Sequence, residues 1–205
     1  MGARAGSDLK MDGVGRASGG HYHHVDISGV STVQGDLDCA RLRVQGVVKI
    51  LGSVKAEHTQ IQGATTIQGN LSGSMVRLEG AIQIQGGCEA DKVVGGGAVG
   101  ITGLLNAEEV SLTLQGSSHV GEIGAGRIRI MRNKRGRGWS LLRPRDILSV
   151  ETIEGDDVYL EDTKAHVVRG NTVVIGPGCQ IDLLEYRTTL EKHPDASIGE
   201  ERRQA

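Results

Sequence analysis

The sequence predicts an all-β fold, a single-stranded parallel β-helix whose turns are about 17 residues long. Three observations support this prediction: residues 27–111 repeat at a fixed period, glycine occupies two fixed positions of every repeat, and apolar residues alternate with polar ones. A fixed period of this length is typical of solenoids, which usually serve as stacks or binding surfaces and are only sometimes enzymes. The glycines are Gly29, Gly46, Gly63, Gly80 and Gly97 at the third position, and Gly35, Gly52, Gly69, Gly86 and Gly103 at the ninth.

The apolar positions of the repeat recur as regularly as the glycines. Alternation of apolar and polar residues is typical of strands, and glycine tolerates positive φ at the corners between them. Each repeat is therefore expected to form one turn of three short strands, with turns stacked about 4.8 Å apart. Outward glutamines such as Gln45 and Gln62 are expected to form ladders between turns. The inward column should contain Val33, Ile50, Ile67, Ile84 and Ile101, and Leu37, Val54, Leu71, Cys88 and Leu105.

Five segments follow one another along the chain. Residues 1–24 are rich in glycine, serine and charged side chains and are expected to form a flexible tail. Residues 25–130 carry the regular turns, residues 131–149 form a basic insertion loop, and the alternation returns over residues 150–186. The charged segment 187–205 is expected to be a second tail. The solenoid should thus contain roughly eight turns.

The composition excludes several classes of function. The formal net charge of −2 indicates no overall preference for nucleic acid. Cys39, Cys88 and Cys179 fall where the pattern requires small inward side chains, so buried free thiols are expected rather than disulfides. The first twenty residues lack the apolar region of a signal peptide, and no apolar run is long enough to span a membrane. We therefore expect a cytoplasmic protein without a small-molecule substrate.

Three histidines, His21, His23 and His24, lie shortly before the first regular turn. Three imidazoles can hold a transition metal. No cysteine or acidic residue at ligand spacing completes such a site in the sequence. The pattern therefore favours a mobile polar segment, and no metal or other cofactor is expected.

The strongest local charge bias lies within the insertion. Basic residues there surround a small apolar cluster that contains Trp139, and no acidic residue interrupts them before Asp146. One interpretation is a solvated loop between turns. The alternative is an adaptor that docks this loop on an anionic membrane or an acidic partner protein, with nucleic acid a weaker candidate. The basic residues are Arg132, Lys134, Arg135, Arg137, Arg143 and Arg145.

An acyltransferase is a further alternative, because enzymes of the hexapeptide-repeat class are also three-sided β-helices. The segment Val173-Val-Ile-Gly-Pro-Gly-Cys-Gln-Ile looks locally like their repeat, but their turn is one position longer than the repeat of this chain. Their catalytic base is a histidine, and His58, His119 and His166 are the candidates. None has an obvious acidic residue to orient it. The sequence therefore predicts no catalytic residue and no enzyme.

The run Ile61-Gln-Gly-Ala-Thr-Thr-Ile-Gln-Gly-Asn-Leu and its neighbouring turns resembles the bactofilins, which are polymer-forming bacterial cytoskeletal proteins. The later segment, with Thr152-Ile-Glu-Gly-Asp-Asp-Val-Tyr-Leu, looks like the longer variant of spore-forming Gram-positive bacteria. The resemblance covers about residues 25–186. It implies a right-handed, three-sided β-helix, filaments assembled end to end without nucleotide, and scaffolding roles in cell shape, envelope organisation or motility. Many bactofilins carry a short apolar N-terminal stretch that targets the membrane, and none is visible in this sequence. The resemblance therefore leaves attachment at the inner face of the membrane, and co-assembly with a paralogue, as open alternatives to a purely cytoplasmic homopolymer.

The ends of the solenoid are the expected sites of self-assembly. The first and last turns of a β-helix present unpaired backbone groups, and the sequence offers no amphipathic helix long enough to cap either end. Many bactofilins end the core with a phenylalanine, which this chain lacks. The residues expected at the contacts are Ile27 and Val33 at the first turn, and Leu183, Leu184 and Tyr186 at the last.

Overall fold

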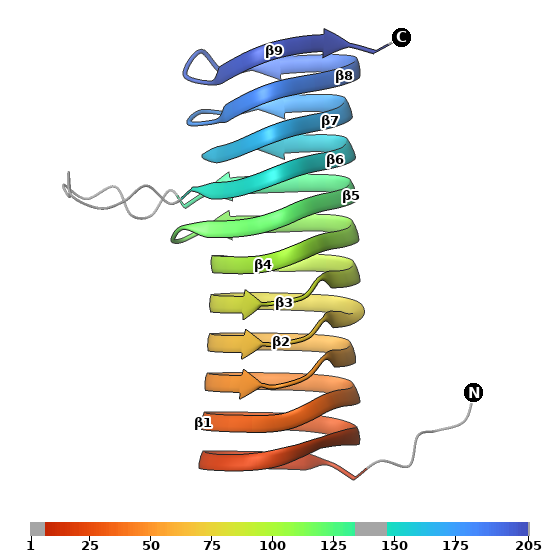
Figure 1. Ribbon diagram of the computed structural model, residues 1–205, viewed down its shortest axis with the longest axis vertical. Helices are drawn as coiled ribbons and strands as arrows, with labels where there is room; N and C mark the ends of the chain where they lie inside the picture. The colour runs from red at the N-terminus through yellow and green to blue at the C-terminus, as the bar shows by residue number, and fades with distance from the viewer. Residues whose placement is uncertain (1–6, 134–146, 205) are drawn as a thin grey trace, which may run out of the picture.

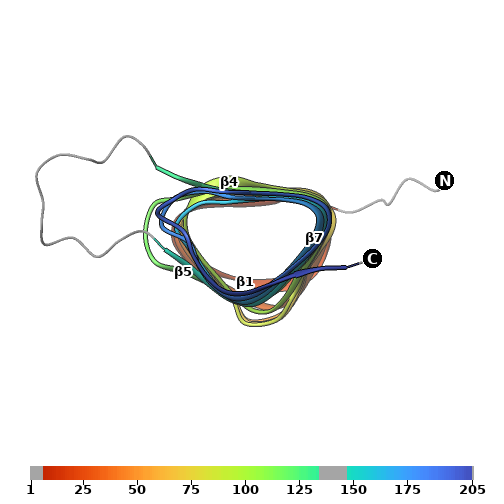
Figure 2. The ribbon, with the colours of Figure 1, turned by 90° about the horizontal axis from the view of Figure 1, so that it is seen from above.

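The computed structural model describes residues 7–133 and 147–204. Over these residues it contains strands and no helix. No described helix is therefore available to cross a membrane. Nine strands form one parallel sheet in the order β1 to β9. Figure 1 shows the sheet wound into a stack of turns, from β1 at the bottom to β9 at the top. The view along the stack in Figure 2 shows a three-sided cross-section. The predicted all-β solenoid is confirmed.

The strands bend around the corners, so that most of them are longer than one side of the solenoid (Figures 1 and 2). Their bounds are Leu9–Ile50 for β1, Val54–Ile67 for β2, Leu71–Ile84 for β3, Cys88–Leu114 for β4, Ser118–Arg132 for β5, Leu148–Leu160 for β6, Thr163–Ile175 for β7, Gln180–Lys192 for β8 and Ser197–Arg203 for β9. Each element pairs in parallel with the one that follows it, because the chain returns to the same side once in every turn.

The repeat sets the register of the first four elements. Leu37 pairs with Val54, Val54 pairs with Leu71, and Leu71 pairs with Cys88. Each of these steps equals the period of the sequence repeat. Equivalent residues of successive repeats therefore stack directly on one another, and the inward positions merge into a continuous apolar column.

The later turns keep the column but change the period. The step from Leu105 to its partner Ile123 is one position longer than the regular repeat. The step from Ile153 to Val168 is two positions shorter than the regular repeat, and the step from Val168 to Leu184 is one position shorter. Corners thus gain or lose residues while the inward-facing positions stay in line. For this reason the apolar alternation, and not the exact period, identifies the C-terminal turns.

The core is one narrow column without phenylalanine. Its largest fully buried side chains are Ile27, Leu37, Leu42, Ile50, Ile61, Ile67, Leu71, Leu78, Ile84, Ile101, Leu105 and Leu114. Cys39, Cys88 and Cys179 are buried free thiols, as predicted. Burial raises the pKa of Cys88 from its ordinary value of 9.0 to about 12, so this thiol stays neutral at physiological pH.

Most of each segment expected to be a tail belongs to the solenoid, which corrects that expectation. Strand β1 starts at Leu9, and β9 ends at Arg203. Both segments contain few large apolar residues, but they are held by backbone pairing with the neighbouring turn. The His23 N–H donates to Ser7 O at 3.3 Å, and the Gln204 N–H donates to Tyr186 O at 2.8 Å. The solenoid is therefore longer than the predicted eight turns.

One corner carries a ladder of polar side chains that cap backbone amides of the next turn. Asp36 Oδ1 accepts a hydrogen bond from the Ser53 N–H at 2.7 Å. Ser53 Oγ accepts from the Asn70 N–H at 3.1 Å, and Asn70 Oδ1 accepts from the Gly87 N–H at 2.8 Å. Each turn thus satisfies an amide that the corner would otherwise leave without a strand partner.

Thr59 is a polar exception within the apolar column. It pairs with Leu42 on one side and Val76 on the other, and its buried hydroxyl has no hydrogen-bond partner among the described residues. A buried hydroxyl without a partner costs about 1–3 kcal/mol. We expect Thr59→Val to stabilise the protein by about 1 kcal/mol in chemical denaturation, and Thr66→Val, which changes a partly exposed position, to have little effect. An unchanged or lower stability of Thr59→Val would contradict this account.

Candidate functional site

The two ends of the solenoid are the surfaces where backbone pairing stops. The sheet runs from β1 to β9 without closing on itself, so its first turn and β9 each have a paired neighbour on one side only. Unpaired strand edges recruit further strands unless something covers them. Within residues 7–133 and 147–204 no helix is present to cover either end. The ends are therefore the candidate site.

At the N-terminal end, Ile27 and Val33 lie one turn inside the solenoid rather than at its surface. Both side chains are completely buried. The preceding turn stacks directly beneath them, as shown by the position of Gly29, where an added Cβ would lie 2.3 Å from the carbonyl oxygen of Gly13. The sequence-based assignment of Ile27 and Val33 to an end contact is corrected, because residues 9–24 form the outer turn.

At the C-terminal end, β9 covers the three residues that were expected to make the contact. Leu183 pairs with Glu200, Leu184 pairs with Glu201, and Tyr186 pairs with Arg203. Leu184 is completely buried. These three residues therefore belong to an inner turn, and their assignment to the end contact is corrected in the same way.

Other apolar residues occupy the outermost turns. Leu9 and Met11 in the first turn of β1 pack against the core and remain partly exposed. Leu190, which lies in β8, and Ile198, which lies in β9, do the same at the opposite end. The sequence analysis missed them because they lie in the two expected tails. These side chains contact the core on one side and solvent on the other, so a second copy of the chain can bury them further.

Charged pairs surround the C-terminal end. Arg169 Nε lies 2.6 Å from Glu185 Oε2, and Arg202 lies 3.8 Å from the other oxygen of Glu185. The hydrogen bond from Arg169 lowers the pKa of Glu185. Arg202 also contacts Glu200 at 2.7 Å. The Arg202–Glu200 pair is exposed and adds little stability, whereas Glu185 is largely buried and links Arg169 of β7 to Arg202 of β9.

The interruption of the solenoid is anchored by a buried acidic residue. Glu161, which is 7% exposed, accepts hydrogen bonds from the Arg132 backbone N–H at 2.9 Å and from the Tyr159 hydroxyl at 2.7 Å. The bond to Glu161 raises the pKa of Tyr159. The Arg132 guanidinium lies 3.8 Å from both Glu161 and Asp162. Glu161 and Asp162 therefore hold Arg132, the last residue of β5. The other proposed contact residues, Lys134, Arg135, Arg137, Trp139, Arg143 and Arg145, lie outside the described residues.

The flanks of the solenoid carry two further surfaces. Gln45 Nε2 donates to Gln62 Oε1 at 3.1 Å, and Gln62 Nε2 donates to Glu79 at 3.0 Å, so the expected ladder forms and ends on a carboxylate. An apolar row runs along another flank, where Val47 is 55% exposed and pairs with Ala64. These surfaces are available for contacts from the side.

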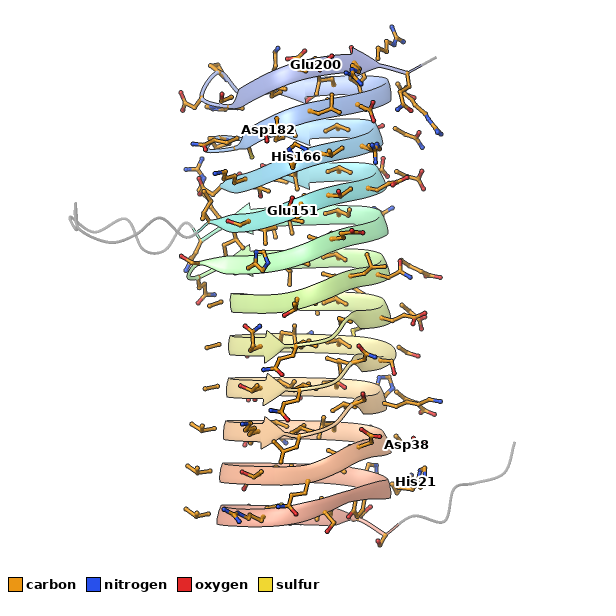
Figure 3. The ribbon with its side chains drawn as sticks, viewed as in Figure 1. His21, Asp38, Glu151, His166, Asp182 and Glu200 are labelled. Carbon is orange, nitrogen blue, oxygen red and sulfur yellow. The ribbon has the colours of Figure 1, made fainter. Side chains whose placement is uncertain are left out.

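The three histidines considered for catalysis, His58, His119 and His166, are exposed. His166 Nδ1 lies 2.9 Å from Asp182 Oδ2 on the next turn, so the expectation that no acidic residue orients a histidine is wrong at this position. Figure 3 shows both residues on neighbouring turns of one face. His21 and Asp38 form a similar pair at 3.3 Å. The side chains of His166 and Asp182 are 65% and 72% exposed, which is typical of surface ion pairs.

Asp8 is a further residue that the sequence analysis missed. It lies in the expected tail, yet the structure brings its carboxylate next to His23 and His24. The signal in the sequence was the spacing between Asp8 and His24, which is one position short of a regular repeat. That spacing has meaning only once residues 7–24 are known to form a turn.

Comparison with known proteins relates part of the chain to two proteins of Bacillus subtilis (strain 168). No family model and no solved structure matches the chain. The uncharacterized protein YhbE is 42% identical over 96 residues, which cover 46% of this chain and 40% of YhbE. The uncharacterized protein YhbF is 45% identical over 98 residues, which cover 47% of this chain and 40% of YhbF. The chain thus matches 40% of the length of these curated relatives and is similar in sequence to that part of them.

Proposed function

We propose that this protein is a bactofilin-like cytoskeletal scaffold of the bacterial cytoplasm. It assembles end to end into filaments without nucleotide and organises the cell envelope, cell shape or motility machinery, with itself or a paralogue as its assembly partner. The observation that carries the proposal is the pair of strand edges that no helix covers in the described residues, each with partly exposed apolar side chains.

Stacking of one copy on another supplies the free energy for assembly. A second solenoid continues the backbone ladder at the spacing of about 4.8 Å that already separates the turns. It also buries the apolar surface around Leu9 and Met11 at one end, and around Leu190 and Ile198 at the other, at about 25 cal/mol per Å². The same interactions hold neighbouring turns together within the chain. Assembly of this kind requires no nucleotide hydrolysis.

A charge placed at either end is expected to prevent filament formation. Met11→Arg and Ile198→Arg put a guanidinium where a second copy would exclude water, and an unpaired buried charge is strongly unfavourable. Both positions are partly exposed in the single chain, so the fold should be retained. The measurement is negative-stain microscopy together with sedimentation of the purified protein without nucleotide. Wild-type protein should form filaments, and both variants should not.

Val47→Arg is the matched control, because it changes an exposed apolar residue on the flank to the same charged residue. Its filaments should persist. The size of the variant species also reports the contact: monomers indicate an N-terminal end that binds a C-terminal end, whereas dimers indicate ends that bind their own kind. Monodisperse wild-type monomers across salt and protein concentrations would overturn the proposal.

A further inference from the structure

An acidic residue and two histidines converge on one corner of the N-terminal turn. One ligand atom from each of Asp8, His23 and His24 lies within 4.8 Å of the other two. His24 Nδ1 is 3.4 Å from Asp8 Oδ1, and His23 Nδ1 is 4.0 Å from the same oxygen. The two imidazole rings have their centroids 4.0 Å apart and are tilted by 48°.

The backbone holds these side chains in place from two successive turns. The His23 N–H donates to Ser7 O at 3.3 Å, which fixes the register of the first turn against the second. The His24 N–H donates to Asp8 Oδ1 at 3.1 Å, so the carboxylate is oriented toward the histidines before any ligand binds. Preorganised ligands lose less conformational entropy when they bind an ion.

We propose that Asp8, His23 and His24 form a binding site for a divalent transition metal of the zinc class. Zinc is bound by imidazole nitrogens and carboxylate oxygens at about 2.0–2.2 Å, so two ligands of a tetrahedral ion lie about 3.4 Å apart. The His24–Asp8 distance already has this value, and the His23–Asp8 distance requires a shift of well under 1 Å. All three side chains are at least partly exposed, so such shifts are accessible. Water would occupy the fourth position.

The chemistry of the ligands selects the class of metal. Two imidazoles favour zinc, nickel, copper or cobalt over calcium and magnesium, which prefer oxygen ligands. The site differs from histidine–aspartate pairs such as His21–Asp38 and His166–Asp182, because it offers two imidazoles to one carboxylate. It therefore supplies three ligands where those pairs supply two.

A bound ion would act as a clip at the open end of the solenoid. Residue 8 lies at the start of the first turn, and residues 23 and 24 lie one turn further along the chain. An ion coordinated by both segments would link the outermost turn to the next one, and ligands that bind only the folded state stabilise it by mass action. The clip thus makes fraying of residues 9–24 less favourable.

The test uses the full-length chain stripped of metal with a chelator. Titration with Zn²⁺ by calorimetry, and with Co²⁺ by visible absorption, should show saturable equimolar binding. Asp8→Asn keeps an oxygen to accept the His24 N–H but removes the carboxylate, and His23→Ala removes one imidazole. Each variant should weaken binding by at least about tenfold, the loss that even an outer-shell change produces. Zn²⁺ should also slow amide hydrogen exchange over residues 9–24 in wild-type protein, but not in Asp8→Asn.

His21→Ala is the matched control, because His21 lies on the same strand and pairs with Asp38 outside the cluster. It should bind Zn²⁺ as tightly as the wild type. Absence of saturable binding, equal affinity of wild type and Asp8→Asn, or an equal loss in His21→Ala would each overturn the proposal. None of these measurements depends on filament formation. A negative result for the metal site would therefore leave the proposed scaffold function untouched, and the reverse also holds.

Discussion

Gly63→Ala is expected to destabilise the solenoid by about 4 kcal/mol or more, a loss usually seen only when a side chain cannot be accommodated. Gly63 has a φ of +116°, and a Cβ at this position would lie 2.3 Å from the carbonyl oxygen of Gly46. The obstructing atom is backbone of the adjacent turn, held by the ladder on both sides. The methyl group therefore forces the two turns apart. Chemical denaturation followed by circular dichroism measures the loss.

Gly35→Ala distinguishes the two possible causes of this loss of stability, the steric clash and the positive φ. Gly35 also has a positive φ, +95°, but a Cβ there would meet nothing within 4 Å. Its replacement should cost only the roughly 1–2 kcal/mol of a left-handed residue with a side chain. If Gly63→Ala and Gly35→Ala cost the same, then φ alone requires the glycines, and the close approach of the turns contributes nothing.

Glu161→Ala is expected to cost about 2–3 kcal/mol, because it removes the acceptor for two hydrogen bonds at a buried position. The Arg132 backbone N–H and the Tyr159 hydroxyl both lose their partner, and the Arg132 guanidinium loses one of its two acidic neighbours. The effect falls at the end of β5, which Arg132 forms. The free energy of unfolding measured in urea gives the magnitude.

Two matched variants interpret that loss. Glu161→Gln retains an acceptor oxygen and nearly the same volume, so it should recover part of the stability. Glu151→Ala removes an exposed glutamate of the neighbouring strand β6 and should change stability by no more than about 0.5 kcal/mol. Equal losses in Glu161→Ala and Glu151→Ala would show that the hydrogen bonds of Glu161 do not stabilise the end of β5.

The repeat makes the fold predictable because, in a solenoid, the number of residues between equivalent side chains equals the number of residues between paired backbone positions. Once Leu37, Val54 and Leu71 are known to be equivalent, their stacking follows, and the pairing confirms it. The shorter C-terminal turns lose the period but keep the alternation, as at Ile153 and Val168. Prediction therefore succeeded over the inner turns, where large apolar residues recur at the inward positions of each turn.

The outermost turns escaped prediction for a physical reason. A terminal turn has a neighbour on one side only, so fewer of its side chains need to be apolar, and backbone pairing retains it despite a polar sequence. Residues 9–24 and β9 are of this kind. Because the sequence places the ends one turn too far inside, it also assigns the end contacts to residues such as Ile27 and Leu184, which are buried in the structure. The same error concealed Asp8 as a neighbour of the histidines.

The ladder at the corner of Asp36, Ser53 and Asn70 also governs how such a chain can change in length. Ser53 and Asn70 each donate a backbone N–H to the turn below and offer a side-chain acceptor to the turn above, so a whole repeat of this kind can be copied or lost without leaving an amide unsatisfied. A single residue inserted within a strand cannot be accommodated in this way, because it would move the inward side chains that follow it to the outside. Gain or loss of one whole repeat thus changes the length of the solenoid by one step of about 4.8 Å.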